Sequence, residues 1–165
     1  RLVGRAKDLI IRGGHNIDPA VIENALLAHP AVTAAQAVGR PDVHAGEGPA
    51  AFVTLTPGAH ATPEQLRAWA SDRVPEQAAA PKAVTVLATL PVTPVGKPFK
   101  PALRAQATRD VIAEALRDVP TVTGVRGVVE DGTVVAVVDL ARGADQTSVT
   151  EVLNSFALTW RLELS

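Results

Sequence analysis

Residues 90–100 read Leu90-Pro91-Val92-Thr93-Pro94-Val95-Gly96-Lys97-Pro98-Phe99-Lys100, a loop bounded by proline and glycine that carries a lysine in a fixed setting. Gly96 permits backbone angles that other residues avoid, which leaves room for the loop to enter a cleft. Lys97 follows directly and places a compact positive charge on a long stem. Such an ammonium group can stabilise charge that develops on carboxylate and phosphate oxygens.

A second segment, near the start of the chain, reads Gly4-Arg5-Ala6-Lys7-Asp8-Leu9-Ile10-Ile11-Arg12-Gly13-Gly14-His15-Asn16-Ile17-Asp18-Pro19. Residues 2–4 and 7–12 have the composition of short strands, and the glycine pair predicts a turn that needs positive φ. Asp18 and Pro19 predict a helix start, because aspartate caps helices and proline lacks only an N–H that would have no partner there.

The segments between these two predict a small α+β fold. Strands are expected at 32–38, 50–55 and 83–87, with a loop at 39–42 and a turn at 46–49. Thr62 and Gln65 form a capping box at the start of a second helix that runs to about Arg73. We therefore expect a small mixed sheet with flanking helices, the first two of them on one face.

The remaining residues predict a small α/β C-terminal appendage. A helix is expected at 101–118, a hairpin of strands 122–129 and 134–140 around an Asp-Gly turn, a helix at 146–156 and a strand at 158–164. The chain is therefore divided into residues 1–108 and an extension of residues 109–165.

Composition excludes several classes of function. Sixteen basic and 17 acidic residues give a net charge of −1, which argues against a general nucleic-acid or membrane-surface role. No apolar run approaches the roughly 20 residues that cross a bilayer. The chain has no cysteine, and its four histidines show no metal-ligand spacing, so no metal site is expected. The absence of cysteine suits a cytoplasmic protein. Because the chain also has no methionine, it is expected to be a fragment of a longer protein.

In this order and separation, the two quoted segments resemble the C-terminal domain of the adenylate-forming enzymes: acyl-CoA synthetases, adenylation domains of peptide synthetases, and luciferases. The resemblance covers residues 1 to about 108 and implies a larger N-terminal adenylation domain upstream. It also implies a ligase that uses ATP, a carboxylic acid and CoA, with Mg²⁺ bound mainly outside this chain. The acid is first adenylated and its acyl group is then passed to the CoA thiol, while the small domain alternates between two positions.

The resemblance assigns the first reaction to Lys97, as the catalytic residue that orients carboxylate and α-phosphate in the closed cleft. It implies that Arg5 contacts the ribose hydroxyls of the adenylate, a task suited to its fork of donors. Lys100 is expected to contact phosphate or substrate. Glu23 matches an acid of the family's first helix and is expected to be structural.

The second reaction is assigned to the segment near the start of the chain. Lys7 falls at the position that resembles the hinge between the two domains, where a residue absorbs a large change in φ and ψ. Gly13 and Gly14 are expected to line the pantetheine tunnel, where a side chain would block close backbone approach. Asn16 is expected in the same loop on the CoA side. Because it stands where some acetate-specific relatives have an arginine that contacts the CoA nucleotide, that one contact is not carried over.

Two alternatives stay open beside the acyl-CoA synthetase. One is an adenylation domain that serves a carrier protein, although the tail shows no carrier motif with a serine to modify. The other is a non-catalytic binding module, whose strand 134–138 would offer an open edge for self-association. In the enzyme reading the isolated chain is expected to be inactive, and the sequence does not name the acid.

Overall fold

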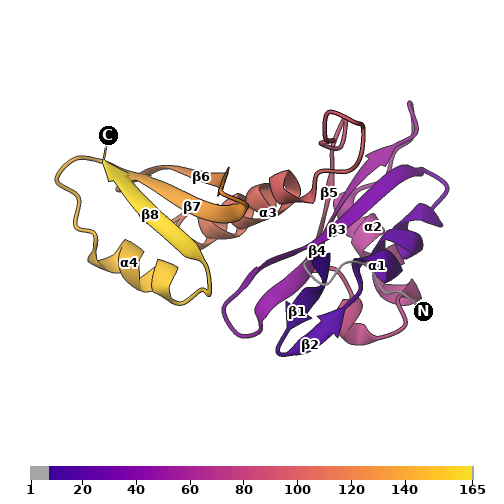
Figure 1. The fold of residues 1–165 in the computed structure, drawn as a ribbon, viewed down its shortest axis with the longest axis horizontal. Coiled ribbons are helices and arrows are strands. Elements are labelled where there is room, and N and C mark those ends of the chain that lie inside the picture. Colours follow the sequence, from indigo (N-terminus) through magenta and orange to yellow (C-terminus); the bar gives the residue numbers. More distant parts are fainter. Residues whose placement is uncertain (1–7, 165) are drawn as a thin grey trace.

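The computed structural model describes residues 8–164, which form two β-sheets on either side of one long helix, α3 (Lys100–Ala115) (Figure 1). Arg5, Lys7 and the strand expected at residues 2–4 lie outside the described residues. The α+β class expected from the sequence is confirmed. No helix among residues 8–164 has the length and apolar character needed to cross a membrane.

The first sheet is mixed, as expected, and runs in the order β2-β1-β4-β3, with β5 paired to β4. The β4–β5 pair is parallel and the other pairs are antiparallel. Its strands are β1 (Ile10–Arg12), β2 (His15–Ile17), β3 (Val32–Asp42), β4 (Gly46–Leu55) and β5 (Ala83–Val86).

Two helices, α1 (Pro19–Leu27) and α2 (Pro63–Arg73), start where their caps predict. An Asp18 carboxylate oxygen accepts the Ala20 N–H at 3.0 Å. Thr62 Oγ1 accepts the Gln65 N–H at 3.1 Å while Gln65 Oε1 accepts the Thr62 N–H at 2.9 Å, so the capping box is complete. Local chemistry alone thus sets both helix starts.

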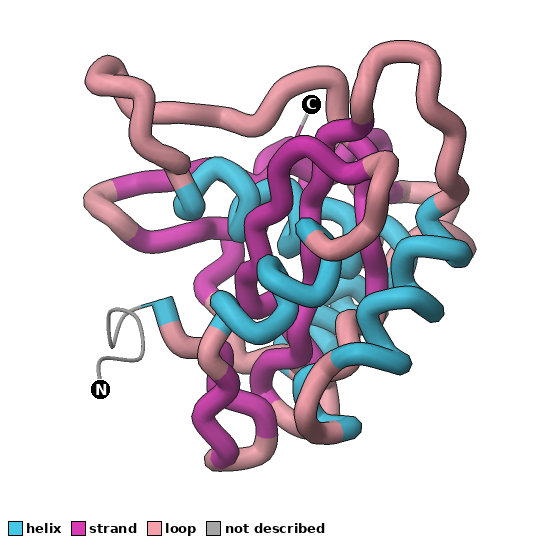
Figure 2. Tube along the Cα trace, turned by 90° about the vertical axis from the view of Figure 1, so that its right-hand side faces the viewer, coloured by secondary structure: helices cyan, strands magenta, loops and turns pink. Residues whose placement is uncertain are grey.

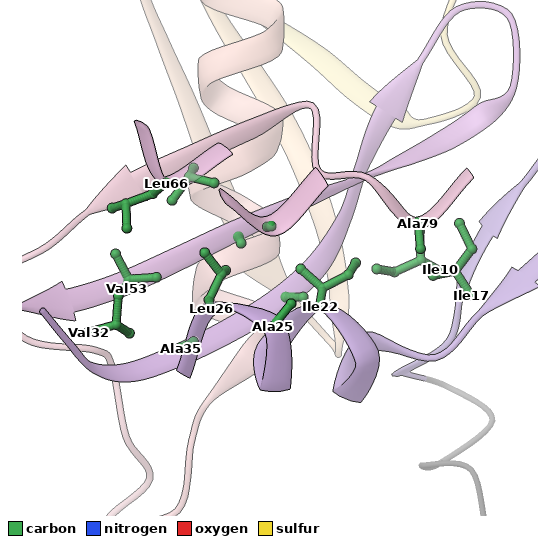
Figure 3. Packing of buried hydrophobic residues seen from close by; sticks show 14 residues of the cluster. Ile10, Ile17, Ile22, Ala25, Leu26, Val32, Ala35, Val53, Leu66 and Ala79 are labelled. Carbon is green, nitrogen blue, oxygen red and sulfur yellow. The ribbon is translucent and has the colours of Figure 1, made fainter. Parts of the chain in front are cut away.

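The main core lies between the first sheet and these two helices. Figure 3 shows Ile22 and Leu26 of α1 packed beside Val53 of β4 and Leu66 of α2. Figure 2, with the right-hand side of Figure 1 toward the viewer, shows helices in front of the strands. The third helix differs: α3 packs on the opposite face, against Val38 and Phe52. The sheet is therefore covered on both faces.

The predicted loop at 39–42 and turn at 46–49 are wrong, because both segments continue β3 and β4. Gly39 pairs with Pro49 and Asp42 with Gly46, so the hairpin extends to its tip. Asp42 accepts the N–H groups of Ala45 and His44, both at 2.9 Å. These bonds, Ala45 first, and the ammonium of Lys82 lower the pKa of Asp42. Pairing with a neighbouring strand overrides the glycine and proline pattern here.

The second sheet has the order β6-β7-β8 and is built as expected from a hairpin, a helix and a last strand. Its turn has positive φ at Asp131 and Gly132. The expectation that strand 134–138 offers an open edge is wrong, because β7 is central, antiparallel to β6 and parallel to β8. The elements are β6 (Val122–Glu130), β7 (Thr133–Leu140), α4 (Thr147–Asn154) and β8 (Thr159–Leu164).

Helix α3 contributes to the cores of both sheets. Leu103 and Ala107 pack with Phe52 of the first sheet, whereas Ile112 and Leu116, which follows the helix, pack with β7 and α4. The boundary expected at residue 108 falls inside this helix and stays a prediction.

An ion pair covers the outer edge of β3. Lys100 Nζ lies 2.9 Å from Glu23 Oε2. The same carboxylate accepts the Ala37 N–H at 2.9 Å, and Lys100 Nζ donates to the Ala37 carbonyl at 3.1 Å. Both backbone groups of Ala37 are thereby satisfied, and α1 and α3 are tied together across β3.

Charged side chains cover the other face of the second sheet, away from α3 and α4. Arg126 contacts Asp139 and Glu163, and Arg161 contacts Glu163 and Glu130. The hydrogen bonds from Arg161 and then Arg126 lower the pKa of Glu163. Val137 lies beneath this layer and is fully buried.

Candidate functional site

The loop of Lys97 is held by Thr93. The Thr93 N–H donates to the Lys97 carbonyl at 2.7 Å, and the Lys97 N–H donates to Thr93 Oγ1 at 3.2 Å. The Gly96 N–H donates to the Thr93 carbonyl at 2.8 Å, and Gly96 has a φ of +82°. A side chain at Gly96 would be strained, so the residue that precedes Lys97 needs to be glycine.

The base of the loop is closed by a bridge between Val92 and Pro98 and by the Phe99 N–H, which donates to the Pro91 carbonyl at 3.0 Å. Lys97 stands exposed near the tip. Its ammonium group has no hydrogen-bond or ion-pair partner within residues 8–164. The backbone is fixed while the charge remains free to meet an external anion.

Lys97 lines an open groove of about 840 Å³. The groove contains charges of both signs, and one of its ion pairs joins Arg104 of α3 to Asp8, at 2.8 Å. It is lined by Asp8, Gln36, Glu47, Thr93, Lys97, Pro98, Phe99, Lys100, Pro101, Arg104, Gly132 and Val134.

Lys100 lies in the same groove, but its ammonium is already used by Glu23 and the Ala37 carbonyl. Only 15% of the Lys100 side chain is exposed. Its contact to phosphate stays a prediction, and in this structure the residue fixes the end of the Lys97 loop to the sheet. Glu23 has the structural role that the sequence suggests.

The glycine pair lies at the tip of the β1–β2 hairpin. Gly13 and Gly14 have φ of +57° and +81°, and a Cβ added to either would meet no atom within 4 Å. Asn16 is exposed on β2, opposite Ile11. In Figure 1 this hairpin lies at the bottom of the view and the loop that leads from β5 to α3 at the top. The two predicted sites are therefore far apart on one domain.

Contacts across the domain fix the glycine hairpin. Arg12 Nη1 donates to the Ala78 carbonyl at 2.9 Å, and His15 Nε2 lies 2.9 Å from a Glu76 carboxylate oxygen. The Gly13 N–H donates to the Ala45 carbonyl at 2.8 Å, joining the hairpin tip to the β3–β4 turn.

Sequence reasoning missed two contributors to the groove. The first is Thr93, whose hydroxyl lies four residues before Lys97 in a proline-bounded loop, a spacing that can be read from the sequence. The second is Glu47, which lies in β4 and not in a turn; its carboxylate accepts the Ile11 N–H at 2.9 Å and lies against Gly39. No local pattern indicates the hydrogen bond between Glu47 and Ile11, because these residues are 36 positions apart.

The described residues hold no group of three His, Cys, Asp or Glu side chains that could bind a metal ion. Carboxylates in the groove are engaged singly, Asp8 with Arg104 and Glu47 with a backbone N–H. Within residues 8–164, Lys97 is therefore an unpaired cation, and no group of carboxylates is arranged to bind Mg²⁺.

The chain matches a known protein family over a range that includes most of the Lys97 loop. Residues 21–97 match the model of the AMP-binding enzyme C-terminal domain, and Lys97 is the last residue of the match. A marinolic acid–CoA ligase from Pseudoalteromonas sp. (strain SANK 73390) is 50% identical over 117 residues, which are 71% of this chain and 17% of that protein.

Solved structures agree in fold. Apo MatB from Rhodopseudomonas palustris superposes with a TM-score of 0.58 at 35% identity, over 62% of this chain and 20% of that one. The amide bond synthetase McbA from Marinactinospora thermotolerans superposes with a TM-score of 0.57 at 38% identity, with the same two coverages. The chain thus spans about a fifth of the length of the relatives that it matches.

Proposed function

This chain carries a C-terminal domain of the adenylate-forming enzyme superfamily, and from that premise we propose that it is the mobile part of an AMP-forming acyl-CoA ligase. The observation that carries the proposal is Lys97, an exposed and unpaired ammonium on a loop whose backbone Thr93 holds in place. The match to a CoA ligase at 50% identity supports this class of reaction.

In the first reaction, Lys97 enters a cleft of the larger N-terminal domain, where ATP and a carboxylic acid are bound. Its ammonium contacts the acid and the α-phosphate, and offsets negative charge as the carboxylate attacks phosphorus and pyrophosphate leaves. Proline and glycine in the loop keep the backbone narrow, and Thr93 holds it in one shape before the substrates arrive. Arg5 would bind the ribose, and Mg²⁺ would be held by the larger domain.

In the second reaction, the domain turns about Lys7, withdraws Lys97 and presents the hairpin tip of Gly13 and Gly14 to the acceptor thiol. The open space around both glycines supports this role, because a pantetheine arm can approach their backbone closely. The separation of hairpin and loop also supports it, since one domain must serve two transition states from different sides.

CoA is the acceptor that we propose, because the relative with 50% identity is named a CoA ligase. The amide bond synthetase has the same fold, so the fold alone leaves the acceptor open. A carrier protein is the second candidate and would be detected by acyl transfer to its phosphopantetheine arm. A cytoplasmic location stays a prediction.

The test is Lys97→Ala in the complete protein. We expect adenylation, followed as acid-dependent pyrophosphate exchange, to fall about 100- to 1,000-fold, the usual effect of removing one group that stabilises transition-state charge. Thioester formation from supplied acyl-adenylate and CoA should stay close to wild type.

Lys82→Ala is the matched control, because Lys82 is another partly exposed lysine of the same domain, paired with Asp42 and outside the Lys97 groove. It should leave both reactions unchanged. An equal loss of both reactions in Lys97→Ala would show that the lysine is structural, and unchanged adenylation would refute the proposal.

A further inference from the structure

Two segments far apart in the sequence line one groove. Thr93, Lys97 and Phe99 belong to the loop before α3, whereas Gly132 lies in the β6–β7 turn and Val134 at the start of β7. The extension of residues 109–165 therefore reaches the neighbourhood of Lys97. The match to the family model ends at Lys97 and so does not include this turn.

The two segments are held in a fixed relation by α3. The helix starts at Lys100, three residues after Lys97, and packs on β3 in one direction and on β6 and β7 in the other. Contact with β6 is very close: a Cβ added to Gly127 would lie 2.0 Å from the Ala105 carbonyl oxygen. Only glycine permits this approach of helix to strand.

Both segments also carry apolar side chains into solvent. Val95 is 80% exposed and Val92 is 57% exposed in the loop, and Phe99 is 38% exposed at its end. Val129, which pairs with Val134 at the end of the hairpin, is 37% exposed. Phe99 lines the groove, and exposed apolar side chains in both segments favour contact with another protein surface.

We infer that the Lys97 loop and the β6–β7 turn form one composite docking surface for the larger nucleotide-binding domain of the same protein. This inference rests on the proposed function. The extension turns with the mobile domain as a single body, and its turn meets the larger domain in the position where Lys97 reaches the substrates. It would then help to hold the closed state for adenylation.

The larger domain is the occupant because it is the surface that Lys97 must enter. The chain spans about a fifth of the relatives' length, so most of such an enzyme lies outside it. The groove is continuous from Lys97 to Gly132, and a body that encloses the loop would reach the turn as well. A free small molecule is less suited, because the groove is open and two of its lining cations, Lys100 and Arg104, are already paired.

Gly132→Asn in the complete protein tests the inference. Gly132 has a φ of +78°, which asparagine tolerates better than most residues, and an added Cβ would meet no atom of the described chain within 4 Å. Gly143→Asn is the control, because Gly143 has the same φ and the same empty surroundings at the other end of β7, outside the groove. The backbone cost of the two substitutions is matched.

Gly132→Asn is expected to slow acid-dependent pyrophosphate exchange about tenfold, as a small misplacement of a closing surface does. Acyl transfer from supplied acyl-adenylate should stay within about twofold of wild type, and Gly143→Asn should leave both reactions unchanged. Equal behaviour of the two asparagine variants in both reactions would overturn the inference.

Lys97→Ala, measured beside them, separates the inference from the function on which it rests. If Lys97→Ala abolishes adenylation while Gly132→Asn has no effect, the proposed function stands and the composite surface is wrong. If Lys97→Ala leaves adenylation intact, the proposed function is wrong, and a selective effect of Gly132→Asn would still support a docking surface at the turn.

Discussion

Thr93 is a positioning residue, since it holds Lys97 without facing the reacting atoms. It bonds both backbone groups of Lys97, and its carbonyl accepts the Gly96 N–H. The cation therefore starts from one backbone geometry, and less ordering is needed when the loop enters a cleft.

Thr93→Val removes the hydroxyl acceptor and keeps the shape of the side chain. We expect kcat for adenylation to fall about tenfold with little change in the KM for ATP, because a misplaced lysine weakens chiefly the transition state. Thr93→Ser should restore the rate, which a purely steric role would not predict. Steady-state pyrophosphate exchange measures both constants, and a rise in KM alone would contradict the positioning role.

At the residue scale, the sequence predicts what local chemistry decides. The caps of Asp18 and Thr62 and the positive φ at Gly13, Gly14 and Gly96 can be read from neighbours within four positions. The pairing of Lys100 with Glu23 could not, because 77 positions separate the two residues. Nothing near Lys100 in the sequence indicates that it anchors α3 to the edge of β3.

At the element scale, α3 joins two sheets through a contact that needs a glycine. Gly127 and Gly124 lie on the same strand, β6, yet their surroundings differ. A Cβ at Gly127 would meet the Ala105 carbonyl at 2.0 Å, whereas a Cβ at Gly124 would meet a carboxylate oxygen of Asp139 at 3.1 Å. Backbone cannot move aside as the end of a side chain can.

Gly127→Ala is therefore expected to lower the free energy of unfolding of the chain by about 3 kcal/mol or more, the upper range for overpacked sites. Gly124→Ala should cost about 1 kcal/mol or less, since the Asp139 side chain can shift. Urea unfolding followed by circular dichroism measures both. Similar losses in the two variants would show that the helix–strand approach is not the cause.

The ends of helices and strands are harder to predict from the sequence than their presence. The β6–β7 hairpin was predicted correctly because Asp131-Gly132 gives the turn and valines give the strands. The ends of β3 and β4 were missed because Gly39, Pro41, Gly48 and Pro49 look like loop residues, and only their pairing across the hairpin makes them strand. Long-range partners, invisible in the sequence, decide such cases.

For the whole molecule, the shared helix predicts cooperative unfolding. Two tryptophans report the two halves: Trp69 of α2 donates its ring N–H to the Ala25 carbonyl at 2.8 Å, and Trp160 of β8 packs in the second core. In Trp69→Phe and Trp160→Phe, fluorescence and circular dichroism should give coincident urea transitions, because neither core keeps its packing once α3 is lost. Two separated transitions in either variant would mean that the sheets unfold independently.

The domain boundary expected at residue 108 also depends on contacts that the sequence does not reveal. The boundary at residue 108 is placed where the resemblance to the family's sequence ends. The structure adds that Thr108 is buried in the middle of α3, with apolar partners of the helix on both sides. The resemblance to the family ends inside α3, so the end of a recognisable sequence need not be the end of a folding unit.

The ion pair of Glu23 and Lys100 has a consequence for behaviour in a crowded solution. β3 is the last strand on its side of the first sheet, and an unpaired edge of this length is a template for aggregation with other copies. Ala37 has neither an N–H nor a carbonyl to offer, because the two charged side chains hold both. The pair thus interrupts the edge near its middle and protects the protein against growth of intermolecular sheets.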